Sequence, residues 1–237
     1  RNEECNLDVK ILMPKVNPKS FIEDYLYKMG IEYPQSYMDK TRCNLEEPNR
    51  YLNIDMATHR LNQAIKNHER IGIIQDCDVD GVCSAVIAYQ FLDSLMVEKP
   101  IVFFHTGKQH GIGDLMPQIL NANLDLLIVP DAGTNDVDAC RELRDNGVNI
   151  IIADHHEIEK ENPFAIVVNC MHGDTNHAAS GTTVMAKIVD RYGERYLSGR
   201  RFNFEDLVAL SLLSDSRSML SIENRAYLNL GFGGCGK

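Results

Sequence analysis

IGIIQDCDVDG, residues 71–81, joins a short apolar run directly to three carboxylates. The run is rich in β-branched side chains and too short for a helix, so it predicts a buried strand. Asp76, Asp78 and Asp80 follow at alternate positions, where the side chains of an extended segment point the same way. Carboxylates held that close repel one another, and a divalent cation is the simplest compensation. The alternative interpretation is an acidic turn in which Asp80 caps the apolar helix that follows.

Length and composition limit the class of protein. The chain has 237 residues, of which 44% are hydrophobic, enough for one α/β domain with a sizeable core, with or without an appendage. Its seven cysteines lack CxxC spacing, which indicates neither a disulfide framework nor a zinc ribbon and favours a reducing, cytoplasmic location. No apolar run approaches the roughly 18 residues of a membrane span, so no membrane partner is expected. A formal net charge of −10 argues against a broad basic face, so any contact with nucleic acid must be local or offset by metal ions.

Strand and helix patterns alternate from residue 55 onward. Strands are expected over 71–74, 101–104, 124–129, 148–153 and 165–168. Helices are expected over 55–68, 82–96, 114–120, 136–144, 182–191 and 204–214. Met56 and Leu61 should lie on the inner face of the first of these helices. The alternation is the signature of βαβ units and predicts an α/β fold, with a mainly parallel sheet and helices on both faces.

The first 51 residues differ from the rest of the chain. Four prolines interrupt any long periodic element. Only residues 20–29 have a helical pattern, with Phe21 and Tyr25 in an apolar stripe that is expected to be core. We therefore expect a lead-in over residues 1–51, followed by a domain over residues 52–237.

Three strands of the expected sheet end in potential metal ligands. These are Asp76–Asp80 after the first strand, Asp131 after the third and Asp154–His156 after the fourth. The carboxyl ends of parallel strands meet at one edge of a sheet, which is where ligands bind. Asp215 directly follows an apolar run and should be partly buried. Carboxylates with one imidazole suit Mn²⁺ or Mg²⁺, and two such ions about 4 Å apart would suit phosphoryl transfer.

Four short motifs occur in a fixed order: DCDVDG at 76–81, PDAG at 130–133, ADHHE at 153–157 and LLSDS at 212–216. Together they resemble the DHH phosphoesterase superfamily, and within it the RecJ family of single-strand-specific exonucleases. The resemblance covers about Leu52 to Gly231. It implies a phosphodiesterase that uses two ions of Mn²⁺ or Mg²⁺.

The resemblance also implies a role for each motif residue. Metal-ligand roles fall on Asp78, Asp80, Asp131, His155 and Asp215. Asp131 would bridge the two ions, and His156 would face the scissile phosphate. Asp76 and Asp154 would be accessory groups that orient the ligands and raise their basicity.

The chain departs from the family pattern at three points. The glycine-rich GxG helix opening of RecJ-like chains is only SGTT here, at residues 180–183. Cys77 stands where RecJ-like chains usually have an aromatic residue between the first two aspartates. Members of the superfamily also generally carry a second, glycine-rich domain that grips the substrate, and nothing after Gly231 supplies it. We therefore expect a partner protein or a C-terminal continuation to close the cleft.

Two loops and one arginine are candidates for substrate contact. His105, Lys108 and His110 follow a strand at the same sheet edge and would contact phosphate, although a solvated loop explains them equally well. The second loop is Ser180, Gly181 and Thr182, which open a helix whose N–H groups can hold a phosphate oxygen. Helix capping alone also explains it. Arg217 lies two residues from Asp215, within reach of a substrate bound there.

Three functions remain open on the sequence. The first is a 5′ to 3′ exonuclease acting on single-stranded nucleic acid, most simply DNA. The second is a phosphodiesterase of short oligonucleotides or cyclic dinucleotides. The third is a binding or scaffold protein that keeps the fold without the chemistry, against which the intact ligand motifs argue. No motif that reads bases distinguishes DNA from RNA, and no feature gives the polarity.

Overall fold

The structure is a computed structural model that describes residues 18–39, 41–96, 98–105, 107 and 109–233. Its contacts divide the chain into two compact units, Arg1–Met38 and Asp39–Lys237. The small unit contains helices α1 (Pro18–Lys28) and α2 (Pro34–Met38). Phe21 and Tyr25 on α1 are both more than half exposed. The prediction that they form a core stripe is therefore wrong.

A five-stranded, wholly parallel sheet forms the centre of the large unit, in the order β2-β1-β3-β4-β5. The strands are β1 (Ile71–Gln75), β2 (Ile101–Phe104), β3 (Leu126–Pro130), β4 (Asn149–Asp154) and β5 (Ile166–Asn169). All five predicted strands are present, and the predicted α/β class is confirmed. Because β1, β3 and β4 are neighbours with parallel register, the segments that follow them meet at one edge.

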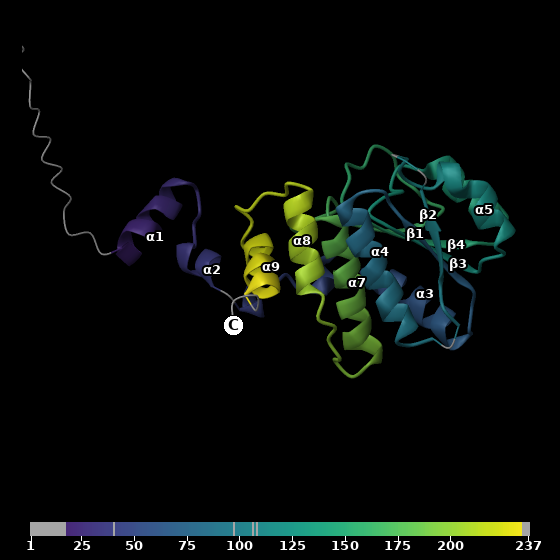
Figure 1. The fold of residues 1–237 in the computed structure, drawn as a ribbon, viewed down its shortest axis with the longest axis horizontal. Coiled ribbons are helices and arrows are strands. Elements are labelled where there is room, and N and C mark those ends of the chain that lie inside the picture. Colours follow the sequence, from purple (N-terminus) through teal and green to yellow (C-terminus); the bar gives the residue numbers. More distant parts are fainter. Residues whose placement is uncertain (1–17, 40, 97, 106, 108, 234–237) are drawn as a thin grey trace, which may run out of the picture. The chain divides into compact units, whose positions relative to one another are not determined.

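Helices cover both faces of the sheet (Figure 1). The helices described in the large unit are α3 (Ile54–Lys66), α4 (Val79–Asp93), α5 (Met116–Asn121), α6 (Val137–Asp145), α7 (Gly181–Tyr196), α8 (Glu205–Ser214) and α9 (Ile222–Phe232), of which α8 packs on α4 and α9 on α8. Short 3₁₀ turns lie at η1 (Arg42–Asn44), η2 (Pro48–Arg50) and η3 (Gly113–Leu115). Alternate strand residues face opposite cores: Ile73 packs in the cluster that contains α3, α4 and α7, whereas Ile74 packs with α5 and α6. No helix within the described part of the chain is both long and apolar enough to cross a bilayer.

Helix α4 begins three residues earlier than its apolar pattern predicts, at Val79 instead of residue 82. The cap is Asp78, whose side chain accepts a hydrogen bond from the Gly81 N–H at 2.8 Å. Asp80 is thus inside the first turn and does not cap the helix. On α3, Leu61 is buried as expected but Met56 is 59% exposed, so its predicted inward position is wrong.

Helix α9 has no counterpart among the predicted elements. It is attached to the core by an ion pair between Lys187 Nζ and Glu223 Oε1 at 2.5 Å, with both side chains buried. The Glu46 N–H donates to the same carboxylate at 2.9 Å. Residues 41–51, which contain Glu46, therefore pack within the large unit. The family-domain boundary expected at residue 52 stays a prediction.

Candidate metal centre

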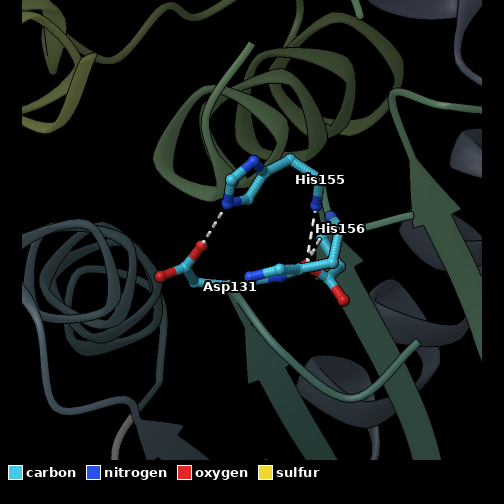
Figure 2. A group of neighbouring side chains, drawn as sticks. Asp131, His155 and His156 are labelled. Atoms are coloured by element: carbon cyan, nitrogen blue, oxygen red, sulfur yellow. Dashed lines mark hydrogen bonds and ion pairs between the residues drawn. The ribbon is translucent and has the colours of Figure 1, made fainter. Parts of the chain in front are cut away.

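Asp131, at the end of β3, is the centre of the cluster. Its backbone has a left-handed conformation, φ +64°, which aspartate tolerates better than most residues. Its N–H donates to the carbonyl of Ala153 at 2.8 Å, which ties the turn to β4. The carboxylate is 2% exposed. Figure 2 shows the ring of His155 turned toward it, with 3.2 Å between His155 Nε2 and Asp131 Oδ1.

Asp80 joins this cluster from the first turn of α4. Its two carboxylate oxygens accept hydrogen bonds from the N–H groups of Gly181 and Thr182, each at 2.9 Å, and the Thr182 hydroxyl donates at 2.6 Å. The positive N-terminus of α7 is therefore directed at this buried carboxylate. A side chain at position 181 does not fit, because a Cβ would lie 2.3 Å from Asp131 Oδ1. Glycine is required for this close approach of α7 to the end of β3.

His155 lies among three carboxylates. Besides Asp131, its Nε2 is 3.7 Å from Asp80 Oδ2 and 3.9 Å from Asp215 Oδ2. Burial is the main cause that lowers the pKa of His155, more than the charge of Asp80 raises it. This shift favours the neutral ring, which is the form that binds a metal ion.

Asp154 supports the second histidine. Its Oδ1 accepts hydrogen bonds from the N–H groups of His155 and His156, at 2.7 and 3.2 Å, and contacts His156 Nδ1 at 2.7 Å. The Thr134 N–H donates to Oδ2 at 3.1 Å. Burial acts to raise the pKa of Asp154, but the hydrogen bond and charge of His156 together with these donors lower it overall. The same hydrogen bond raises the pKa of His156 above its ordinary value.

The charge balance of the cluster fits a bound cation. Burial, followed by the charges of Asp80, Asp78 and Asp154, raises the pKa of Asp131 to about 11. Its Oδ1 accepts no hydrogen bond from the described residues although it is buried. A buried carboxylate among like charges is unfavourable unless a proton or a cation neutralises it. A donor set made mainly of carboxylate oxygens suits Mn²⁺ or Mg²⁺.

The predicted ligands do not all gather to the same degree. Four of them lie close together, since carboxylate oxygens of Asp80, Asp131 and Asp215 all lie within ion-pair distance of His155 Nε2. Asp78 is exposed and its carboxylate caps α4, although its charge still acts on Asp131. Its role as a metal ligand stays a prediction.

The predicted contact loop after β2 has its own partners. His105 Nε2 contacts the Gly111 carbonyl at 2.9 Å and so braces the loop. His110 Nδ1 is 2.8 Å from Asp76 Oδ2, which brings two predicted site residues together. Lys108 lies outside the described residues.

The other predicted substrate contacts already have partners within the protein. The N–H groups of Gly181 and Thr182 bind Asp80, and the Ser180 hydroxyl contacts that of Ser211 at 2.8 Å. A phosphate would have to displace these hydrogen bonds. Arg217 lies 3.7 Å from Asp215 Oδ2, but its guanidinium also donates to the carbonyls of residues 177 and 178.

Two residues of the site were absent from the sequence prediction. Thr134 holds Asp154, and the Asn169 amide donates to the Thr134 hydroxyl and to the His156 carbonyl, each at 3.0 Å. Asn169 is the last residue of β5. The aspartates were identified because they follow the carboxyl ends of parallel strands. The same reasoning could have identified Asn169 as well.

Known proteins resemble this chain in sequence and in structure. YorK of Bacillus subtilis (strain 168), provisionally described as an SPbeta prophage-derived single-strand DNA-specific exonuclease, is 29% identical over 210 residues, 87% of this chain and 36% of its own length. The crystal structure of RecJ in complex with Mn²⁺ from Thermus thermophilus matches with a TM-score of 0.68 and 26% identity, over 77% of this chain and 27% of that one. A crystal structure of exonuclease RecJ bound to manganese matches with a TM-score of 0.71 and 25% identity, over 81% of this chain and 49% of that one.

This chain spans about a third of the length of YorK. The family described as "DHH family, N-terminal domain" matches residues 70–212. That range covers more than half of the chain and includes the first three motifs and the start of the fourth. The resemblance found in those motifs is confirmed, and the chain belongs to the DHH family.

Proposed function

We propose that this chain is the catalytic domain of a metal-dependent phosphodiesterase that degrades single-stranded DNA from the 5′ end. The observation that carries the proposal is the buried Asp131 carboxylate, surrounded by other acidic groups and contacted by the neutral ring of His155. Relatives named as single-strand DNA exonucleases support the substrate class. RecJ structures with bound Mn²⁺ or Mg²⁺ support the choice of metal.

The proposed ligands are Asp78, Asp80, Asp131, His155 and Asp215. Two ions held there would neutralise charge on the phosphate and lower the pKa of an attacking water. Asp131 would help to hold these ions, because its buried carboxylate lies 3.2 Å from His155 Nε2 and among other acidic groups. Asp80 is oriented by the start of α7, so its position is fixed before any ion binds.

His156 is the proposed contact to the scissile phosphate. Asp154 occupies its Nδ1 and raises its pKa, which favours the protonated ring. Nε2 is then a charged donor suited to a phosphate oxygen on which negative charge develops. The ring is 57% exposed, whereas that of His155 is 7% exposed. The two adjacent histidines thus have separate proposed roles, His155 toward metal and His156 toward substrate.

The test is hydrolysis of single strands labelled at either the 5′ or the 3′ end, in DNA and RNA of graded length, with Mn²⁺ present. We expect mononucleotide release from the 5′ end of DNA, and its loss in Asp131→Ala. Asp145→Ala, which changes an exposed carboxylate at the end of α6, is the matched control and should retain activity. Equal activity of Asp131→Ala and the control would refute the proposed site. Folded protein without Mn²⁺-dependent hydrolysis of any substrate would favour a binding role.

A phosphodiesterase of short oligonucleotides is the second candidate, favoured by the net charge of −10. Binding of long strands depends on many contacts between basic side chains and phosphates. Preferential cleavage of the shortest strands in the same assay would support this alternative.

A further inference from the structure

Three metal-binding side chains of different types meet beside the Asp131 cluster. They are Asp76 and Cys77, just after β1, and His110 from the loop after β2. His110 Nδ1 is 2.8 Å from Asp76 Oδ2. Cys77 Sγ is 3.9 Å from His110 Nδ1 and 3.6 Å from Nε2. One donor atom from each residue lies within 4.8 Å of the other two.

The position of the sulfur does not favour a simple thiol nucleophile. In a nucleophile–histidine–aspartate arrangement, the sulfur lies along the axis of one ring nitrogen while the carboxylate binds the other. Here Cys77 Sγ is nearly equidistant from both nitrogens of His110, so it lies beside the ring. The His110 ring is therefore poorly oriented to take a proton from the thiol.

The separations do fit three ligands of one ion. Around a tetrahedral zinc ion, with Zn–S of about 2.3 Å and Zn–N and Zn–O of about 2.0 Å, sulfur and nitrogen lie about 3.5 Å apart and oxygen and nitrogen about 3.3 Å apart. The corresponding distances here are 3.9 Å from Cys77 Sγ to His110 Nδ1 and 2.8 Å from Asp76 Oδ2 to that nitrogen. These two distances have to change by only about half an ångström each, and the His110 ring also has to turn, because the sulfur lies beside the ring and not on the axis of Nδ1. Cys77 and His110 are exposed, so their side chains can make that adjustment.

We propose that Asp76, Cys77 and His110 form a separate site for Zn²⁺, with an open fourth position. A thiolate and an imidazole favour zinc over Mn²⁺ and Mg²⁺, whereas the carboxylate-rich cluster around Asp131 favours the harder ions. The two neighbouring sites therefore differ in metal preference.

This zinc site would share a cavity with the histidine proposed to contact substrate. Asp76 and His110 line a hollow of about 280 Å³ together with Asp154 and His156. A zinc ion held by the first pair would bring positive charge to the lining of the cavity that also contains His156. Zinc would also hold His110 at the end of β1.

The test is a titration of the full chain with Co²⁺, a spectroscopic substitute for zinc, after saturation with Mg²⁺. We expect a thiolate-to-cobalt charge-transfer absorption at one equivalent, displaced by Zn²⁺. Cys77→Ser should abolish that absorption, whereas Cys43→Ser, at another exposed cysteine, should retain it. His110→Ala should weaken Co²⁺ binding by at least about tenfold.

A second measurement works on the unaltered protein. Zn²⁺ should slow alkylation of Cys77 by iodoacetamide but leave Cys43 unaffected, as read by mass spectrometry of peptides. An absent charge-transfer band, a band that survives in Cys77→Ser, or equal protection of both cysteines would overturn the zinc site. None of these readouts depends on nuclease activity.

Discussion

Replacing Asp131 with asparagine should stabilise the metal-free protein. Burial and neighbouring carboxylates raise the pKa of Asp131 to about 11, so the folded protein without metal holds this group protonated at pH 7. The unfolded chain holds it ionised, because an ordinary aspartate has a pKa of about 3.9. Asparagine has the shape of the protonated carboxyl group and cannot ionise. Asp131→Asn therefore removes the cost of protonation on folding.

The sign and size follow from proton linkage. A group whose pKa is raised by folding contributes stability that is complete below its unfolded pKa. That stability is lost as pH rises toward the folded pKa, here between about pH 4 and pH 11. The loss is at most about 1.4 kcal/mol per pH unit. At pH 7, metal-free Asp131→Asn should exceed the wild type in unfolding free energy by up to about 4 kcal/mol.

Urea unfolding at pH 6, 7 and 8, after treatment with a chelator, measures the effect. The wild type should lose up to about 3 kcal/mol relative to Asp131→Asn across this range. His155 and His156 are present in both the wild type and Asp131→Asn. Subtracting the unfolding free energy of one protein from that of the other therefore largely removes the contribution of these histidines. Asp145→Asn is the control for loss of an exposed charge and should follow the wild type.

Adding Mn²⁺ should reverse the order. The wild type should gain stability because the ion binds the folded state, by about 2.7 kcal/mol at a hundredfold excess over its dissociation constant. Asp131→Asn, which lacks the central carboxylate, should gain much less. The explanation fails if wild type and Asp131→Asn have parallel pH profiles without metal, or if both respond equally to Mn²⁺.

Four further predictions follow from the same site. The melting temperature should rise with the logarithm of Mn²⁺ concentration, and a curve indifferent to both Mn²⁺ and chelator would favour a scaffold role. Asp154→Asn should lower the pKa of His156, measured by NMR titration; an unchanged pKa would contradict the role of that hydrogen bond. Gly181→Ala should cost about 1–3 kcal/mol by overpacking against Asp131, whereas Gly113→Ala, where a Cβ meets nothing, should be near neutral in thermal unfolding. Single-stranded DNA should bind weakly and with steep salt dependence, as measured by fluorescence anisotropy; tight binding to long strands at physiological salt would contradict the inference from a net charge of −10.

The sheet and the centre of the site were predictable from local pattern. Short apolar runs followed directly by Asp131 and by Asp154 marked strand ends, and parallel pairing brings such ends together without knowledge of the loops. The sequence pattern could not predict how deeply each side chain is buried. Asp78 and Asp80 are two residues apart, yet one is exposed and the other 1% exposed, because the helix begins between them.

Features that depend on long-range partners could not be predicted. From its sequence alone, Lys187 would be placed on the surface of a helix. Only the fold brings it to Glu223, 36 residues later. Helix α9 lacks a clear apolar stripe, so its sequence alone gave little signal. The contact of His110 with Asp76 likewise spans 34 residues and leaves no local pattern.

The attachment of Asp80 to α7 affects the choice of an inactive variant for trapping substrate complexes. Asp80 satisfies two N–H groups and a hydroxyl at the start of that helix, so its removal leaves buried donors without partners. A failed assay with an Asp80 variant would then not distinguish lost chemistry from a displaced helix. His156 is more than half exposed and receives no comparable set of contacts. His156→Ala is therefore the better starting point for crystallising this protein with an uncleaved strand.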